Sequence, residues 1–281
     1  MDRTSLAFAR SFLFVPGDRS DRFAKAMSSG ADVVICDLED SVQIDRKAFA
    51  RSELATWLDR GGCASVRINA TDSSEFSADC AALMAVSGIR SLIVPKAEDP
   101  ASLRALHDEF SRMIPIIALI ETALGLHRAQ EIAEIPGVIR LAFGSIDFAL
   151  DLHSSEDSQV LNFARFGIVM ASRIAGIAPP IDGVTRDLDN PEATGTAARM
   201  SRRLGFGGKL CIHPKQVLPI NRAFIPTAKE IRNAQLVLAS STDGSAVRLD
   251  GQMVDKPVVD RARFNLEQAG LLSPHDHEGR T

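Results

Sequence analysis

Eight short apolar segments recur along the chain, and their spacing constrains the fold more than any other feature of the sequence. They span residues 11–16, 32–40, 64–69, 91–96, 115–122, 138–147, 179–184 and 208–214. Most are apolar throughout rather than alternating, which is typical of strands covered on both faces. Segments of helical character separate most of them, at residues 20–30, 45–62, 99–110, 121–135, 158–177 and 190–208. Strands that alternate with helices predict a parallel sheet, and eight strands close a (β/α)8 TIM barrel.

The chain continues past the eighth predicted strand for longer than a barrel requires. We expect a barrel catalytic domain over residues 1–225 and a C-terminal helical extension over residues 226–281. The extension contains a turn-rich stretch at 242–257 and a predicted helix at 258–272, and it either packs over the barrel or reaches a neighbouring subunit. Residues 273–281 are expected to be disordered.

Composition narrows the classes of function. The 281 residues are 45% hydrophobic and 24% charged, which is typical of a soluble globular protein. Net charge is −4 without a long basic block, so we expect no nucleic acid partner. No apolar run approaches the ~18 residues of a membrane span. The start of the chain runs into Pro16-Gly17 and is interpreted as a first strand rather than a signal peptide. Four widely spaced cysteines favour a cytoplasmic protein without disulfides.

Polar residues end nearly every predicted strand. Active sites of barrels form at these C-terminal strand ends. One polar residue at a strand end is unremarkable, but a whole series is not. In chain order the series is Asp37, Glu39, Asp40, Arg67, Asn69, Lys96, Glu98, Glu121, Asp147, Asp182 and His213.

Glu121 lies within the apolar stretch PIIALIETALGL, where an ionised carboxylate needs a partner. About one strand–helix unit separates it from Asp147, so both are expected to project from adjacent strands into one mouth. Two carboxylates completed by water and substrate oxygens are the usual arrangement around Mg²⁺. The alternative is a carboxylate pair that performs acid–base chemistry without metal.

Two basic residues and one turn complete the candidate site. Arg67, at the end of an apolar strand, is expected to clamp a carboxylate or polarise a carbonyl, with a structural ion pair to Asp37 or Glu39 as the alternative. Lys96 serves similarly or balances the acidic residues. The Pro16-Gly17 turn offers backbone amides to an anion, and Arg10 and Arg19 favour phosphate contact there. For His213, a supporting or packing role is as plausible as a functional one.

With these residues assembled, the chain resembles the citrate lyase β-subunit family within the HpcH/HpaI aldolase/citrate lyase superfamily. The resemblance rests on RSFLFVPG, CDLEDSV, VRIN, IVPKAE, LIETALG, AFGSIDFALDL, CIHPKQ and GQMVDKP, in family order from about residue 10 to 271. The stretch HSSEDSQVLNFARFG matches least well, which leaves thioester or acid specificity open.

The resemblance implies a magnesium enzyme that acts on acyl thioesters. Glu121 and Asp147 match the family's metal ligands, and Arg67 matches the arginine that holds the substrate. Asp255 matches an acid–base aspartate of malyl-CoA and citramalyl-CoA lyase relatives. Asp37, Glu39 and Asp40 match the acidic strand that orients metal-bound waters. In such relatives the C-terminal extension covers a neighbouring subunit's site, which implies a homo-oligomer, a trimer or hexamer.

Three functions are compatible with these residues. The first is a carbon–carbon lyase that splits a 3-hydroxyacyl thioester, on CoA or acyl-carrier protein, into an acetyl thioester and a 2-keto acid. The second is a malate synthase-like acyltransferase or thioesterase on acyl-CoA. The third is a non-catalytic barrel scaffold, which the presence of Glu121, Asp147, Arg67 and Asp255 disfavours.

Overall fold

A computed structural model of the chain describes residues 3–110, 114–156, 158–240, 247–249 and 252–272. The chain divides into two compact units, Met1–Phe224 and Ile225–Thr281. Residues 273–281, for which the sequence predicts disorder, lie outside the described part. Within the described residues, no helix is both long and apolar enough to cross a membrane.

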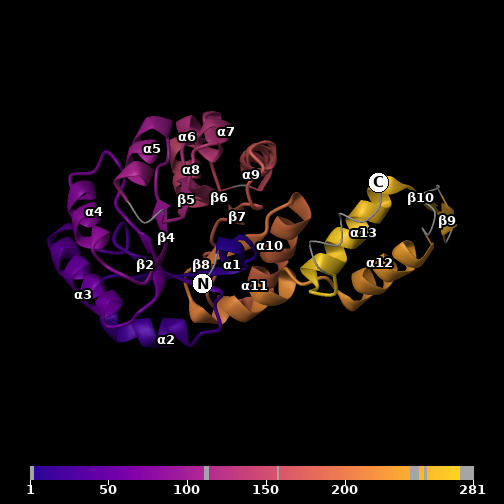
Figure 1. The fold of residues 1–281 in the computed structure, drawn as a ribbon, viewed down its shortest axis with the longest axis horizontal. Coiled ribbons are helices and arrows are strands. Elements are labelled where there is room, and N and C mark those ends of the chain that lie inside the picture. The colour runs from indigo at the N-terminus through magenta and orange to yellow at the C-terminus, as the bar shows by residue number, and fades with distance from the viewer. Residues whose placement is uncertain (1–2, 111–113, 157, 241–246, 250–251, 273–281) are drawn as a thin grey trace. The chain divides into compact units, whose positions relative to one another are not determined.

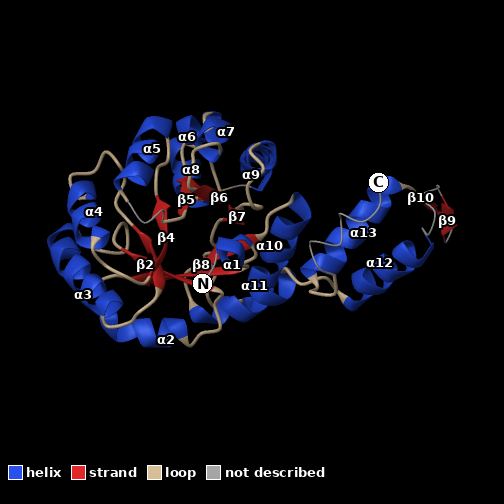
Figure 2. Ribbon diagram, viewed as in Figure 1, coloured by secondary structure: helices blue, strands red, loops and turns tan. Residues whose placement is uncertain are grey.

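The first unit is a closed barrel of eight parallel strands in chain order, which confirms the predicted fold (Figures 1 and 2). β1 pairs with both β2 and β8, so the sheet has no free edge. The strands are β1 (Ser11–Pro16), β2 (Val33–Asp37), β3 (Ala64–Arg67), β4 (Ile89–Val94), β5 (Ile116–Ile120), β6 (Val138–Phe143), β7 (Ile181–Asp182) and β8 (Gly208–Cys211).

One helix precedes β1, and the others follow the strands and lie around the barrel (Figure 2). They are α1 (Arg3–Ala7), α2 (Phe23–Met27), α3 (Lys47–Asp59), α4 (Phe76–Met84), α5 (Pro100–Glu109), α6 (Ala123–His127), α7 (Ala129–Ala133), α8 (Ser145–Asp151), α9 (Ser158–Ile174), α10 (Pro191–Leu204) and α11 (Val217–Ala223). Local signals explain where α5 begins. Asp99 caps the helix by accepting from the amides of Ala101 and Ser102, and Pro100 lies in its first turn. None of α1, α4, α8 and α11 was predicted from the sequence.

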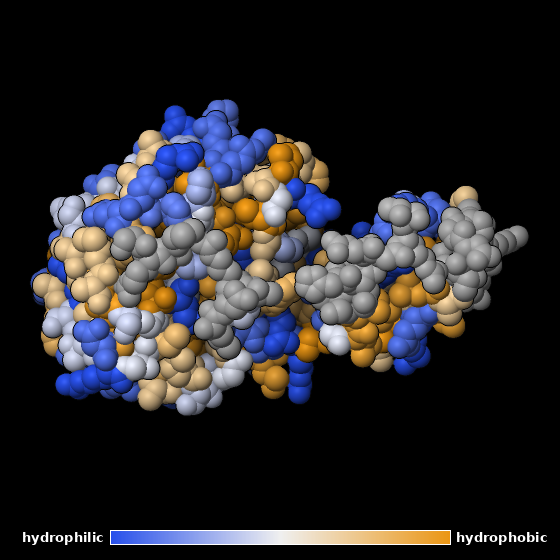
Figure 3. Space-filling model, in the orientation of Figure 1, coloured by the Kyte–Doolittle hydropathy of each residue, from blue (hydrophilic) through white to orange (hydrophobic). Residues whose placement is uncertain are grey.

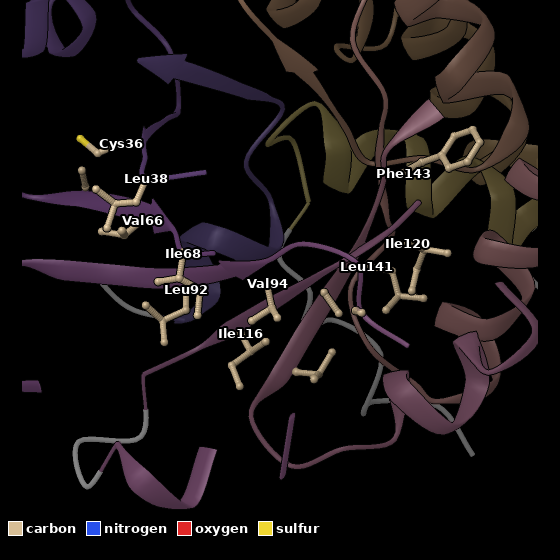
Figure 4. Packing of buried hydrophobic residues seen from close by; sticks show 14 of the residues in the cluster. Cys36, Leu38, Val66, Ile68, Leu92, Val94, Ile116, Ile120, Leu141 and Phe143 are labelled. Atoms are coloured by element: carbon tan, nitrogen blue, oxygen red, sulfur yellow. The ribbon is translucent and has the colours of Figure 1, made fainter. Parts of the chain in front are cut away.

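The strands are apolar throughout because they are buried on both faces. Alternate side chains fill the barrel interior, including Val33, Ile35, Ile117 and Leu119. Their neighbours fill the layer between strands and helices, where Figure 4 labels Cys36, Leu38, Val66, Ile68, Leu92, Val94, Ile116, Ile120, Leu141 and Phe143. The surface is mixed: in Figure 3 hydrophilic and hydrophobic residues are interspersed over the visible face of the barrel unit.

Arg140, on β6, is a fully buried cation, and all the hydrogen bonds described for its guanidinium are donated to backbone carbonyls. Its guanidinium donates to the carbonyls of Leu6, Ala9 and Pro179 at 2.7–3.0 Å and lies over the ring of Phe12. Burial lowers the pKa of Arg140 to about 9. These bonds tie α1 and the start of β1 to the strand on which Arg140 lies.

Asp182 does not face the barrel mouth, contrary to the expectation for the end of the seventh strand. On the two-residue strand β7, Ile181 belongs to the interior cluster, so Asp182 points outward to α9 and α10. It accepts from Arg165 Nε at 2.8 Å and Lys209 Nζ at 3.2 Å, and from the Ser201 hydroxyl. Burial alone would raise the pKa of Asp182, but the charges of Lys209 and Arg165 lower it to about 2.

The described part of the second unit contains two helices and a pair of short strands. α12 (Ala228–Ser240) and α13 (Lys256–Gln268) pack through Ala234, Ala262 and Leu266. β9 (Val247–Leu249) and β10 (Gln252–Val254) pair in antiparallel fashion. The predicted C-terminal helical extension is therefore confirmed, and its turn-rich stretch contains a strand pair that the sequence analysis did not predict.

Candidate active site

A pocket of about 310 Å³ opens at the C-terminal ends of the barrel strands. Its charged lining comes from β2, β3, β5 and their following loops, and from α8. Apolar side chains, two serines and one glycine form the remaining wall. The lining residues are Phe14, Asp37, Asp40, Ser41, Arg67, Leu119, Glu121, Phe143, Gly144, Ser145, Ile146, Asp147, Val184, Leu210 and Ile212.

Glu121 follows β5 directly and is 2% exposed. Leu119 faces the barrel interior, so the alternation of the strand points Glu121 inward as well. Its Oε1 accepts from the backbone amide of Lys96 at 2.7 Å. Its Oε2 is buried and has no hydrogen-bond partner within the described part of the chain. A buried carboxylate oxygen without a partner is costly, and it indicates a ligand that completes the site.

Asp147 lies in the first turn of α8 rather than at the end of β6, because that strand stops at Phe143. The sequence prediction of its position was therefore wrong in detail. The partly exposed side chain still lines the same pocket as Glu121, so the structure brings the two carboxylates together. Gly144 alone separates the strand from the helix.

Arg67, at the end of β3, is held by three carboxylates. Its Nε and Nη2 each donate to Asp37 at 2.7 Å, which is a bidentate pair. Nη1 lies 2.8 Å from Glu39 Oε2 in an ion pair without hydrogen-bond geometry, and 3.4 Å from Asp40 Oδ2. The guanidinium also lies over the ring of Phe14. The ion pairs to Asp37 and Glu39, which were the structural alternative for Arg67, are present. The guanidinium of Arg67 nevertheless lines the pocket.

The carboxylates respond differently to this cation. Burial would raise the pKa of Asp37, but the charge of Arg67 lowers it below its usual range. Burial raises the pKa of Glu39 to about 7, although Arg67 opposes the shift. Burial and the charge of Glu39 raise the pKa of Glu121 to about 8. Burial and the charge of Asp40 also raise the pKa of Asp147. One guanidinium therefore does not neutralise the pocket.

A divalent cation fits this donor set. Among the described residues, no group of three or more histidine, cysteine, aspartate or glutamate side chains is arranged to hold a metal. Glu121 and Asp147 line the pocket together and could serve as two protein ligands of a metal whose remaining ligands would be water or substrate. Mg²⁺ is usually bound in this way, whereas structural Zn²⁺ takes four protein ligands.

Lys96 enters the site mainly through its backbone. Its side chain is 49% exposed, with Nζ 3.8 Å from Glu39 Oε1. Burial would lower the pKa of this ammonium, but the nearby carboxylates raise it.

The Pro16-Gly17 turn lies beside Asp37. The amide of Gly17 donates to the carbonyl of Asp37 at 2.7 Å. It is therefore not free to bind an anion, contrary to the prediction. Arg10 pairs with Asp32 before the start of β2, and Arg19 pairs with Asp21, so neither supports the predicted phosphate contact. His213 accepts from the amide of Lys215 as a cap of the following turn, which is a packing role.

A buried network behind the acidic loop was missed by the sequence analysis. Lys47, the first residue of α3, donates to the carbonyls of Leu38 and Glu39 at 2.8 and 3.0 Å and to Asn69 Oδ1 at 2.6 Å. Asn69 donates in turn to Asp79 at 2.6 Å. Asn69 therefore faces this network rather than the mouth. The start of a helix near Lys47 was the only sequence signal available.

Asp255 belongs to the second unit. It is half-buried and caps α13, with Oδ1 accepting from the amide of Val258 at 3.3 Å. A Pro in the first turn of α13 strengthens this helix start.

An eight-stranded barrel whose mouth holds several carboxylates and one arginine is typical of aldolase-type enzymes, and comparison with known proteins agrees. Residues 10–214 match the family model described as HpcH/HpaI aldolase/citrate lyase. The chain belongs to this family.

Individual relatives cover almost the whole chain. The citrate lyase subunit beta of Leuconostoc mesenteroides subsp. cremoris is 36% identical, with 96% of each chain covered. The (3S)-malyl-CoA thioesterase of Cereibacter sphaeroides is 31% identical, with 94% of this chain and 95% of the relative covered. A Mycobacterium tuberculosis protein named CitE, solved in complex with magnesium, acetoacetate and coenzyme A, superimposes with a TM-score of 0.85 at 34% identity, covering 94% of this chain and 99% of that one.

Proposed function

We propose that the protein is a magnesium-dependent carbon–carbon lyase that cleaves, or forms, a 3-hydroxyacyl thioester. The products of cleavage are an acetyl thioester and a 2-keto acid. The observation that carries the proposal is the buried, unpartnered Oε2 of Glu121 in a pocket shared with Asp147 and Arg67. The relative solved with magnesium and coenzyme A supports both the cofactor and the thioester class.

Each residue of the site has a distinct task in this proposal. Glu121 and Asp147 would hold Mg²⁺, which when bound supplies a Lewis acid for the oxygens of the acid fragment. Arg67 offers a fixed positive charge where negative charge develops on an oxygen during cleavage. Its three carboxylate partners, Asp37, Glu39 and Asp40, are proposed to fix its orientation and to orient water around the metal, which accords with the distances above.

The mouth of the pocket is proposed to bind the substrate. The ammonium of Lys96 supplies positive charge near Glu39. Pro16 and Gly17 are proposed to contribute shape rather than a free amide, because the Gly17 amide already donates to the carbonyl of Asp37. The exposed Ile146 and Ile212 offer an apolar wall to the acyl chain.

The reaction also needs a group that removes the hydroxyl proton in the cleavage direction. We propose Asp255 for this step, supplied by a second copy of the chain in a homo-oligomer, a trimer or a multiple of it. Asp255→Ala and Glu121→Ala variants would each be inactive, and their dissociated and reassembled mixture should regain activity. A mixture of Glu121→Ala with Arg67→Ala is the control, because every barrel then carries a lesion. If the first mixture stays as inactive as the control, Asp255 does not act on a neighbour.

The reaction itself is tested with a panel of 3-hydroxyacyl-CoA thioesters and Mg²⁺, analysed by mass spectrometry. A lyase yields a free 2-keto acid and a shortened thioester in equal amounts. Release of free CoA instead would favour the thioesterase or transferase, the alternative suggested by the malyl-CoA thioesterase relative. An inactive protein that binds no Mg²⁺ would favour a scaffold. Parallel panels on acyl-carrier protein distinguish the two carriers.

A further inference from the structure

Lys96 adopts a backbone conformation that side chains rarely take. Its φ is 45°, and His153 is the only other non-glycine residue with positive φ in the described part of the chain. This left-handed region is uncommon for residues with a β-carbon, and outliers of this kind cluster at functional sites. Lys96 follows Pro95, two residues after the end of β4.

The pairing of β4 with β5 explains what this conformation does. The amide of Leu92 donates to the carbonyl of Pro115 at 2.9 Å. In a parallel ladder every second residue of a strand donates to the same neighbouring strand. The amide of Lys96, four residues after Leu92, would therefore be expected to donate to the carbonyl of Leu119, four residues after Pro115. That carbonyl instead accepts from the amide of Ala97 at 3.2 Å. Lys96 is therefore an extra residue in the ladder, as in a bulge.

The extra residue frees one amide, and that amide is the one that binds Glu121. It donates to Oε1 at 2.7 Å, which leaves Oε2 as the unpartnered oxygen. The lysine side chain takes no part in this bond, because the donor is the backbone amide. The side chain itself is half exposed.

We propose that Lys96 is a positioning residue with two separable roles: its left-handed backbone orients Glu121 for the cation, and its ammonium acts only on the charge of the mouth. The inference rests on the proposed metal site. Cation affinity should then depend on the backbone conformation of Lys96 and not on its positive charge.

A first experiment tests the contact without any metal. Hydrogen exchange of the Lys96 amide is measured by NMR in the metal-free wild type and in the Glu121→Ala variant. We expect exchange at Lys96 to accelerate at least about tenfold in the variant, because the acceptor is lost. The amide of Ala97, bonded to Leu119, is the internal control and should keep its rate. Equal exchange of Lys96 in the two proteins would overturn the proposal.

A second experiment measures Mg²⁺ binding to metal-free protein by calorimetry. Lys96→Gly tolerates the left-handed backbone, and Lys96→Leu removes the charge while keeping an unbranched β-carbon. Both should bind Mg²⁺ within about threefold of wild type. Lys96→Val places a β-branched residue in this conformation and should bind about tenfold more weakly, with circular dichroism confirming its fold.

The outcomes separate this inference from the proposed function. If wild type binds Mg²⁺ but the glycine and leucine variants lose it as fully as the valine variant, the charge rather than the backbone matters and the inference is wrong. If wild type binds no Mg²⁺, the proposed function fails, and hydrogen exchange still decides whether Lys96 orients Glu121.

Discussion

Gly144 packs against Glu121 so closely that a β-carbon at position 144 would overlap both Oε2 and Cβ of that glutamate. Its φ is −87°, so the requirement for glycine is the contact and not the backbone conformation. Gly144, the residue just before α8, thus forms one wall of the cavity in which the unpartnered carboxylate oxygen lies.

Gly144→Ala should displace Glu121 and weaken Mg²⁺ binding by at least about tenfold, because a ligand shifted by a fraction of an ångström no longer fits its site. Calorimetry with Mg²⁺ measures the effect. Gly195→Ala is the matched control: it lies within α10, and its β-carbon would meet the flexible Arg199 side chain at 3.3 Å. An alanine at 144 that binds Mg²⁺ like wild type would show that this contact does not fix the glutamate.

Lys47→Met should destabilise the acidic loop. The carbonyls of Leu38 and Glu39 would lose a donor in a buried place, which costs about 1–3 kcal/mol. Urea unfolding measures this loss, and kcat should fall more than the KM for the thioester changes, since Arg67 loses its fixed surroundings. Lys25→Met, at an exposed position of α2, is the control and should leave both unchanged. Unaltered stability and kcat in Lys47→Met would contradict a positioning role.

Arg67→Lys keeps the charge and loses the planar fork that binds Asp37 through two nitrogens. Loss of a transition-state donor costs roughly 10²–10³ in rate, and we expect a fall of that order in kcat. Steady-state kinetics on the thioester identified by the panel measures it. A lysine variant with wild-type kcat would reduce the role of Arg67 to that of a point charge.

Much of the fold follows from sequence pattern, because a strand buried on both faces must be apolar throughout. That pattern located all eight barrel strands. It could not locate α4, whose residues show no strong cap, or place Asp147 on a helix, since the strand and the helix are separated by Gly144 alone. The same difficulty affected Asp182: on a two-residue strand, alternation is too short to reveal which way a side chain points.

The pairing of buried charges was the least predictable feature. Lys209 is 2% exposed, yet its sequence neighbours are ordinary strand residues. Its partner Asp182, and Arg165, which also pairs with Asp182, come from other elements, and only the closed barrel brings them together. For Glu121 and Asp147, in contrast, spacing alone predicted one shared mouth, and both line the same pocket.

Asp182 should make stability depend on pH under acidic conditions. Its folded pKa, about 2, is below the ordinary value, so the ionised carboxylate stabilises the fold above about pH 4 and this contribution is lost as pH falls through about 2. Asp182→Asn leaves Lys209 without its charge partner and should cost about 3–5 kcal/mol at pH 7. Urea unfolding should show the gap between variant and wild type shrinking between about pH 4 and pH 2. A gap that stays constant over this range would exclude the proposed charge interaction.

The most direct test of the account is calorimetric titration of Mg²⁺ into metal-free protein. Wild type should bind one ion per chain, and Glu121→Gln and Asp147→Asn should each weaken binding by at least about a hundredfold while circular dichroism stays unchanged. Asp151→Asn, an exposed carboxylate on the same helix as Asp147, is the control and should bind like wild type. Wild-type affinity in both ligand variants, or no binding by wild type, would contradict the metal site on which the account depends.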